Sequence, residues 1–290
     1  MKIERRRFVA MFGTLAAAAT TRDLRADEPQ LTEPVHRVAN ASKRDPAAAQ
    51  GLDRALEMAR EGLQNSRENI YDYTAVLVKR EQVGGSLGQH EYMFLKMRNR
   101  KVTSGRVTQP FSVYLSFLKP ASVKGREVIY VEGQNDGNMV AHEGGLKGKF
   151  LPTVKVPPDG MLAMRGQRYP LTEIGVENLI EKLIERGEAA SKYPDVSCEF
   201  RQGARLKDRA CTVIQVTQPT RRPDADFYQA QIFIDDELNV PIRYIAYDWP
   251  NRAGEAGQVI EEYNYLNLEV NVGLTDSDFN PRNKAYNFYS

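Results

Sequence analysis

The clearest strand pattern in the chain is FSVYLSFLKPASVKGREVIYVEGQNDGNMVAHEGG, residues 111–145. Apolar residues alternate with others over Phe111–Leu118, which is the period of two expected of a strand with one apolar face. Lys119–Pro120 ends that run, because proline cannot donate a hydrogen bond to a sheet ladder. Further strands are predicted over Val128–Val131 and Met139–His142, separated by turn residues. The stretch therefore predicts an antiparallel meander, and it contains no catalytic constellation.

Strands are also predicted on both sides of this meander. Before it, Ile70–Glu81 and Glu91–Arg98 are strand-like and flank a glycine-rich turn at residues 84–88. After it, the same criteria predict strands over residues 196–200, 210–217, 229–235, 241–247 and 259–270. Because strands joined by short turns pair antiparallel, we expect one continuous antiparallel sheet.

Two segments have the apolar spacing of amphipathic helices instead. The first begins at Gly51 and runs to about Ser66, with Leu52, Ala55, Leu56, Ala59 and Leu63 on one face. The second has its apolar stripe over Val176–Ile184 and ends near Gly187. Each apolar face needs a partner, so we expect both helices to lie on the sheet and the fold class to be α+β.

The N-terminus has the layout of an export signal. Met1–Arg7 is basic and Phe8–Ala19 is a short apolar run that ends in alanines. The arginine pair before Phe8 resembles a bacterial twin-arginine signal. We therefore predict a signal peptide at 1–26, a flexible leader at 27–50, a single domain at 51–290, and a soluble periplasmic protein after cleavage. An uncleaved N-terminal membrane anchor is the alternative.

Composition and motifs argue against several classes of function. Forty Lys and Arg against 38 Asp and Glu give a net charge of +2, which offers no electrostatic footprint for nucleic acid. No G-x-S-x-G, P-loop or H-E-x-x-H motif is present. His142–Glu143 is the one pair that could bind a metal or move a proton, but further ligands are missing. We expect no metal, no cofactor and no enzyme activity, with a hydrolase using His142 and Glu143 as an alternative.

Cys198 and Cys211 are the only cysteines, and both lie in a predicted hairpin. An exported protein can oxidise such a pair to a disulfide. The turn predicted around residues 206–208 does not place the two directly opposite each other. A disulfide and two free thiols therefore both remain open.

Two parts of the chain resemble known families. Residues 239–243 (NVPIR), 263–265 (YNY) and 274–281 (LTDSDFNP) look like the final strands of the lipoprotein carriers LolA and LolB. Residues 117–133 (FLKPASVKGREVIYVEG) resemble an uncharacterised bacterial family, DUF1571, and that likeness extends over most of the mature chain. The resemblance implies an incomplete antiparallel β-barrel, LolA/LolB-like, whose concave apolar face is covered by helices.

The resemblance also implies a function. We expect an exported, monomeric carrier-like protein that holds lipid or lipoprotein acyl chains in the apolar half-barrel. The predicted cavity wall consists of Met93, Leu95, Met97, Phe111, Val113, Leu115, Phe117, Ile129 and Val131. The predicted lid consists of Met161, Leu162, Met164 and the 176–184 stripe. The alternatives are a scaffold that binds an envelope protein without any ligand, and simple packing of these side chains against one another.

Overall fold

The computed structural model describes residues 36–37, 51–148, 150–252 and 254–289. Every described residue belongs to one compact unit, residues 33–290. The predicted signal peptide at 1–26 lies outside the described residues. The predicted leader at 27–50 does so too, apart from the two residues of β1.

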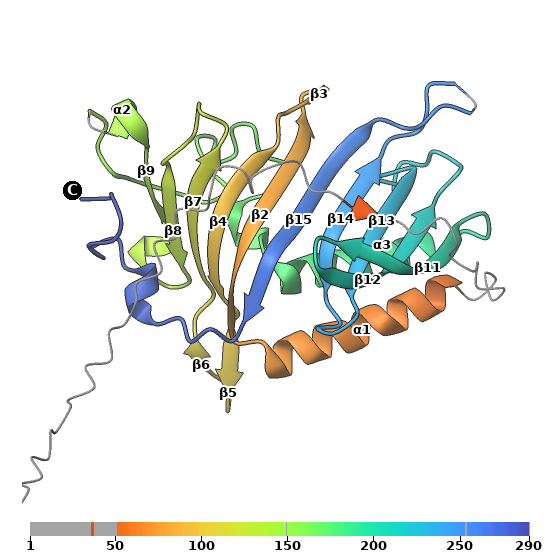
Figure 1. The fold of residues 1–290 in the computed structure, drawn as a ribbon, viewed down its shortest axis with the longest axis horizontal. Helices are drawn as coiled ribbons and strands as arrows, with labels where there is room; N and C mark the ends of the chain where they lie inside the picture. The colour runs from red at the N-terminus through yellow and green to blue at the C-terminus, as the bar shows by residue number, and fades with distance from the viewer. Residues whose placement is uncertain (1–35, 38–50, 149, 253, 290) are drawn as a thin grey trace, which may run out of the picture. The chain divides into compact units, whose positions relative to one another are not determined.

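Fifteen strands are found in the described residues, and thirteen of them form one antiparallel sheet. Its order is β1-β11-β12-β13-β14-β15-β2-β4-β7-β8-β9-β10, with β3 paired to β2, while β5 and β6 form a separate hairpin (Figure 1). The strands are β1 (His36–Arg37), β2 (Asp72–Val83), β3 (Ser86–Leu87), β4 (Glu91–Arg98), β5 (Lys101–Thr103), β6 (Arg106–Gln109), β7 (Ser112–Lys119), β8 (Glu127–Val131), β9 (Met139–His142), β10 (Val154–Val156), β11 (Ser197–Leu206), β12 (Arg209–Thr217), β13 (Gln229–Asp235), β14 (Pro241–Tyr247) and β15 (Val259–Val270).

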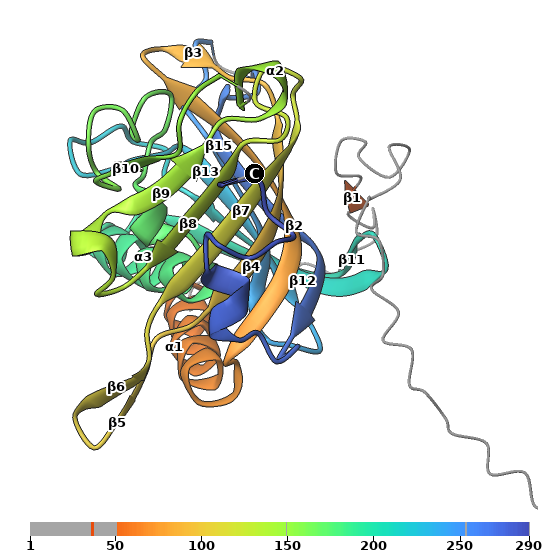
Figure 2. The same ribbon diagram turned by 90° about the vertical axis from the view of Figure 1, so that its left-hand side faces the viewer.

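The sheet is curved and open. Among the described strands, β1 and β10 stand at the two ends of the path and do not pair with each other. Figure 2 shows the sheet curving around the side on which α1 and α3 lie, and we call that side the concave face. The predicted α+β class and incomplete antiparallel barrel are confirmed.

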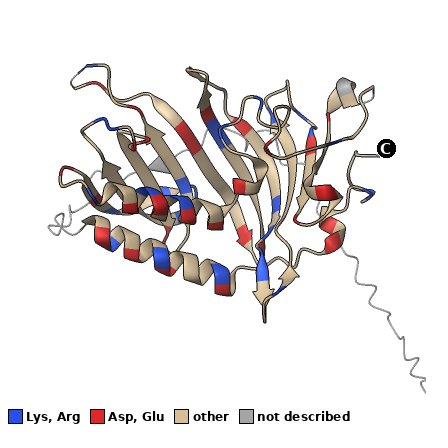
Figure 3. Cartoon of the chain, turned by 180° about the vertical axis from the view of Figure 1, so that it is seen from behind, with Lys and Arg blue, Asp and Glu red and all other residues tan. Residues whose placement is uncertain are grey.

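Two long helices cover part of the concave face. They are α1 (Gly51–Asn69) and α3 (Val176–Ala190), and they lie on the same side of the sheet (Figure 3). Leu52, Ala55 and Met58 of α1 and Leu179 and Leu183 of α3 pack on a buried cluster from β11–β15. These five side chains are partly buried, so each contributes less than the roughly 1.5–3 kcal/mol of a fully buried aliphatic side chain. The helices are thus fixed to one half of the sheet. The shorter helices are α2 (Gly145–Gly148), η3 (Asn135–Gly137), η4 (Leu171–Glu173) and η5 (Asp276–Phe279).

The opposite, convex face has its own apolar core, which the C-terminal segment covers. Tyr114 and Ile129 are directly paired across β7 and β8, and they pack with Phe279 and Phe288. The ring of Tyr286 stacks on Tyr114 with centroids 4.2 Å apart. The segment after β15 therefore seals the convex side of β7–β9.

The two cysteines are free thiols rather than a disulfide. Cys198 pairs with Val216 and Cys211 with Ala204, so the two cysteines are offset by five residues along the hairpin. At about 3.3 Å per strand residue this offset is roughly 17 Å, beyond the reach of a disulfide. Burial raises the pKa of Cys198 to about 12 and that of Cys211 to about 11.

None of the helices in the described ranges is both long enough and apolar enough to span a membrane.

Candidate functional site

A cavity of about 790 Å³ lies between the concave face and the segment that covers it. This volume falls within the roughly 300–1,000 Å³ typical of small-molecule sites. The sheet contributes apolar lining residues Leu77, Met93, Leu115, Phe117, Val128 and Met139. The covering segment, residues 151–175, contributes Leu151, Val154, Val156, Pro158, Leu162 and Ile174. One half of the cavity is therefore apolar on both its floor and its cover.

The strand registers explain why these sheet residues share a face. Met93 lies opposite both Leu77 and Phe117, and Leu115 lies opposite Val128. Directly paired residues project to the same side of a sheet, and side chains alternate along each strand. The alternation predicted for residues 91–98 and 111–118 thus sets the cavity floor.

Four of the predicted wall and lid residues line the cavity, namely Met93, Leu115, Phe117 and Leu162. Leu179, which belongs to the predicted helical stripe, also lines it. Leu95, Met97 and Val113 project to the same face, but they are at most 1% exposed and do not reach the cavity. They are buried farther along β4 and β7, away from the cavity, where Tyr73 Oη donates a hydrogen bond to Met97 Sδ at 2.7 Å.

The other predicted wall and lid residues lie elsewhere. Ile129 and Val131 project from the convex face, where Phe279, Tyr286 and Phe288 cover them, so their placement on the wall is wrong. Phe111 precedes β7 and its ring packs near Tyr130, with centroids 6.2 Å apart. Met161 is 91% exposed, and neither Met161 nor Met164 lines the cavity.

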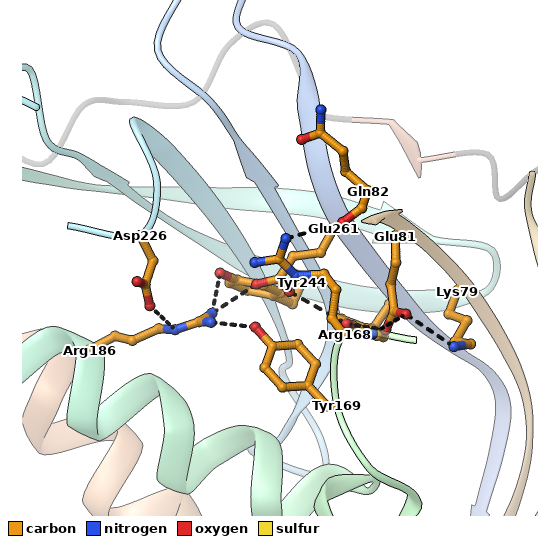
Figure 4. Close-up of polar contacts among 10 residues, drawn as sticks. Lys79, Glu81, Gln82, Arg168, Tyr169, Arg186, Asp226, Tyr244 and Glu261 are labelled. Carbon is orange, nitrogen blue, oxygen red and sulfur yellow. Dashed lines mark hydrogen bonds and ion pairs between the residues drawn. The ribbon is translucent and has the colours of Figure 1, made fainter. Parts of the chain in front are cut away.

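A cluster of buried charges forms the second half of the cavity lining (Figure 4). At its centre is Glu261 of β15, whose side chain is 3% exposed. Arg186 of α3 donates from Nη1 to Glu261 at 2.9 Å, and Arg168 forms an ion pair with Glu261 at 3.1 Å. Arg186 also donates to the Tyr244 and Tyr169 hydroxyls, at 2.8 and 2.7 Å. One carboxylate thus joins the sheet to both α3 and the covering segment.

Glu81 of β2 makes a second attachment for the covering segment. It accepts a hydrogen bond from the backbone N–H of Arg168 at 3.0 Å and one from Tyr263 Oη at 2.6 Å. Lys79 forms an ion pair with Glu81 at 3.3 Å and donates to Gln167. Residues 167–169 are therefore held to the sheet by β2 and β15 together.

Burial and the neighbouring groups shift the pKa values of several side chains in the cluster. Burial lowers the pKa of Arg186, but Tyr244 and Glu261 outweigh it and the pKa is raised overall. Burial and the neighbouring Glu261 raise the pKa of Tyr244 and of Tyr263. At neutral pH the arginine is therefore charged and both tyrosines are neutral donors.

His142 and Glu143 both line the cavity, but they have different partners. His142 Nδ1 lies 3.1 Å from Thr153 Oγ1, and Glu143 forms an ion pair with Arg126 at 2.9 Å. No group of three His, Cys, Asp or Glu side chains able to hold a metal occurs within the described ranges.

Sequence reasoning missed the charged cluster, although a signal was present. Lys79, Glu81 and Glu261 occupy positions in strands 72–83 and 259–270 that alternate in step with buried apolar residues. Charged residues at such positions are expected to be paired, because an isolated buried charge is costly.

Comparisons with solved structures give distant similarities. A DUF1329 family protein from Desulfovibrio piger is 13% identical, with 79% of this chain and 97% of that chain covered and a TM-score of 0.38. A LolA superfamily protein from Nitrosomonas europaea is 11% identical, with 80% and 97% covered and a TM-score of 0.30. A chain of the Pseudomonas aeruginosa MucA/MucB complex is 14% identical, with 78% and 60% covered and a TM-score of 0.42.

Sequence comparison places the chain in a family. No curated protein matches it. Residues 70–288 match the family model described as "Protein of unknown function (DUF1571)". The match includes every strand from β2 to β15 and the whole of α3. The chain therefore belongs to the DUF1571 family, as its sequence indicated.

Proposed function

We propose that this protein binds an amphipathic lipid, or the lipid-modified end of a lipoprotein, with acyl chains in the concave cavity. The observation that carries the proposal is the two-part lining of the 790 Å³ cavity. Its apolar half, over β4, β7 and β8, suits hydrocarbon. Its polar half, around Arg186 and Glu261, offers hydrogen-bonding partners for a headgroup.

The energetics favour a long-chain ligand. Each methylene moved from water into the apolar half contributes about 0.8 kcal/mol, so ten methylenes contribute about 8 kcal/mol. Association itself costs on the order of 4–15 kcal/mol. Short acyl chains therefore bind weakly, and affinity rises with chain length until the apolar half is full.

We further propose that the protein is exported and acts as a soluble monomer in the periplasm after cleavage of residues 1–26. The basic and apolar pattern of that segment supports export. The hydrolase alternative has less support, because the His142 ring bonds to Thr153 and the Glu143 carboxylate pairs with Arg126.

The first test is native mass spectrometry with lipid extraction on protein purified from the periplasm of an expressing bacterium. We expect co-purifying acyl chains in near one-to-one amount. A lipid-free mass, together with no binding of added long-chain fatty acid by the folded protein, would overturn the proposal.

A cavity-filling variant makes the test specific to the site. Ala141 lines the cavity, and Ala141→Trp should reduce bound lipid by occupying that space. Ala121→Trp is the matched control, because Ala121 is exposed in the turn after β7 and does not line the cavity. Circular dichroism must show that both variants are folded. Equal lipid content in the two variants would exclude the cavity as the lipid site.

The apolar floor and the histidine provide three further variants. Leu115→Asp or Phe117→Asp should abolish lipid uptake where the fold survives, because each places a charge on the apolar floor. His142→Ala should leave uptake unchanged. A hydrolytic turnover that His142→Ala removes would instead support the enzyme alternative.

A further inference from the structure

Exposed apolar side chains are concentrated beside the cavity. The described residues include twelve large apolar side chains that are exposed, and six of these lie between residues 146 and 162. They are Leu146 (77% exposed), Phe150 (84%), Leu151 (47%), Val154 (38%), Met161 (91%) and Leu162 (66%). A concentration of this kind marks an interaction surface, whereas scattered exposed side chains do not.

This surface lies at the mouth of the cavity. Leu151, Val154 and Leu162 are exposed to solvent and also line the cavity, so they sit at its opening. Phe150 and Met161 adjoin Leu151 and Leu162 in the chain. The edge strand β10 carries Val154 (Figure 2). We call residues 146–165 the mouth segment.

The mouth segment is also basic. Its described basic side chains are Lys155 and Arg165, against a single acid, Asp159. Lys155 and Arg165 are exposed, and neither makes an ion pair with another described residue. Arg165 lines the cavity as well. Positive charge and exposed apolar side chains therefore occur together on this side of the opening.

The acidic residues at the opening lie on the other side, near α3. They are Glu173, Glu181 and Glu185. Glu181 is paired with Arg67, and Glu185 with Lys182 at 2.9 Å, so most of this negative charge is compensated locally. The acidic side does not neutralise Lys155 and Arg165.

We propose that the mouth segment docks on the surface of an anionic lipid bilayer, with the cavity opening toward the membrane. Exposed Phe, Leu and Met side chains insert at the boundary between headgroups and acyl chains, while lysine and arginine attract anionic headgroups. A second copy of this chain fits less well, because two basic mouth segments would repel each other.

The proposal gives the cavity a source of ligand. This docking inference rests on the proposed lipid-binding function, since a bilayer supplies the amphipathic lipids that the cavity suits. A ligand entering at Leu162 would move from hydrocarbon into the apolar half without crossing bulk water.

The test is vesicle flotation with the full mature chain. We expect binding to vesicles of equimolar phosphatidylcholine and phosphatidylglycerol, little binding to pure phosphatidylcholine, and loss of binding in about 0.5 M salt. Lys155→Gln with Arg165→Gln should weaken binding to anionic vesicles about tenfold or more.

An apolar variant and a matched control complete the test. Phe150→Ser with Met161→Ser should weaken vesicle binding, whereas Val102→Ser with Val107→Ser should not. The control pair is 49% and 47% exposed and lies on the separate β5–β6 hairpin. Equal binding to both vesicle types, binding to neither, or a loss caused by the hairpin variant alone would overturn the proposal.

The two proposals can fail separately. Co-purifying lipid without vesicle binding leaves the carrier function standing and refutes membrane docking. Vesicle binding by a protein with no lipid in its cavity refutes the carrier function and supports docking alone.

Discussion

Replacing Glu261 with glutamine tests whether the buried charge cluster anchors the cover of the cavity. Glu261→Gln keeps the size of the side chain and removes its charge. In the wild-type protein this carboxylate pairs with Arg186 of α3 and Arg168 of the covering segment, at 2.9 and 3.1 Å. The variant leaves both guanidinium groups without their shared counter-ion.

The expected loss follows from the burial of the three side chains. Glu261 is 3% exposed, Arg186 13% and Arg168 29%. Removing one partner of a buried ion pair typically costs about 3–5 kcal/mol. Arg168 is partly solvated and Arg186 retains Asp226 at 3.3 Å, so we expect the lower end, about 3 kcal/mol. For a domain of this size that lowers the melting temperature by roughly 6–12 °C.

An exposed ion pair of similar geometry serves as the control. Arg60 of α1 and Glu188 of α3 are 2.7 Å apart but 57% and 54% exposed. Glu188→Gln should therefore cost less than about 1 kcal/mol. The measurement is urea unfolding followed by circular dichroism for both variants. Equal losses of free energy in the two variants would refute the argument that burial of the cluster anchors the cover.

Three further predictions concern other parts of the fold. Gly175 has φ of 116°, and an added Cβ would lie 2.6 Å from Met97 Sδ, so Gly175→Ala should lower the unfolding free energy by about 2–3 kcal/mol in urea. Phe288→Ala should cost about 3 kcal/mol in the same assay, because this ring is 2% exposed in the convex core. Burial raises the pKa of Glu262, but hydrogen bonds from His90, Asn264 and Arg243 and the charge of Arg243 lower it overall, from 4.5 to about 2. The lowered pKa means that ionised Glu262 stabilises the folded state by about 3 kcal/mol. This contribution is complete above about pH 4.5 and is lost as the pH falls toward 2. The stability difference between wild type and Glu262→Gln should therefore shrink by this amount between about pH 6 and about pH 2; a constant difference would contradict the assignment.

The elements of the fold could be predicted because each has a clear period. Strand alternation over 91–98 and 111–118 correctly placed Met93, Leu115 and Phe117 on one face. The same reasoning failed for β8, where both interleaved sets of residues are apolar. Val128 is paired with Leu115 on the concave face, and Ile129 with Tyr114 on the convex face. Periodicity alone cannot assign faces when a distant segment covers the second one.

The charge cluster depends on contacts that local sequence does not encode. Glu81 and Glu261 are directly paired across β2 and β15, which lie about 180 residues apart in the chain. Arg168 comes from a segment without regular periodicity, and Arg186 lies among the apolar residues on the sheet-facing side of α3, three residues after Leu183. The pairing of these residues follows from the strand order, and a single sequence does not specify that order.

The position of the cavity follows from the way the two faces of the sheet are covered. Behind β7–β9, Phe279, Tyr286 and Phe288 fill the convex side. On the concave side, α1 and α3 pack chiefly over β11–β15 rather than over β4, β7 and β8. Those strands are covered by residues 151–175, whose only regular elements are the short β10 and η4. An irregular segment cannot present the continuous apolar stripe with which a helix fills a curved sheet. The unfilled space therefore lies where helical cover ends, and the buried charges at Glu81 and Glu261 hold the irregular cover at that boundary.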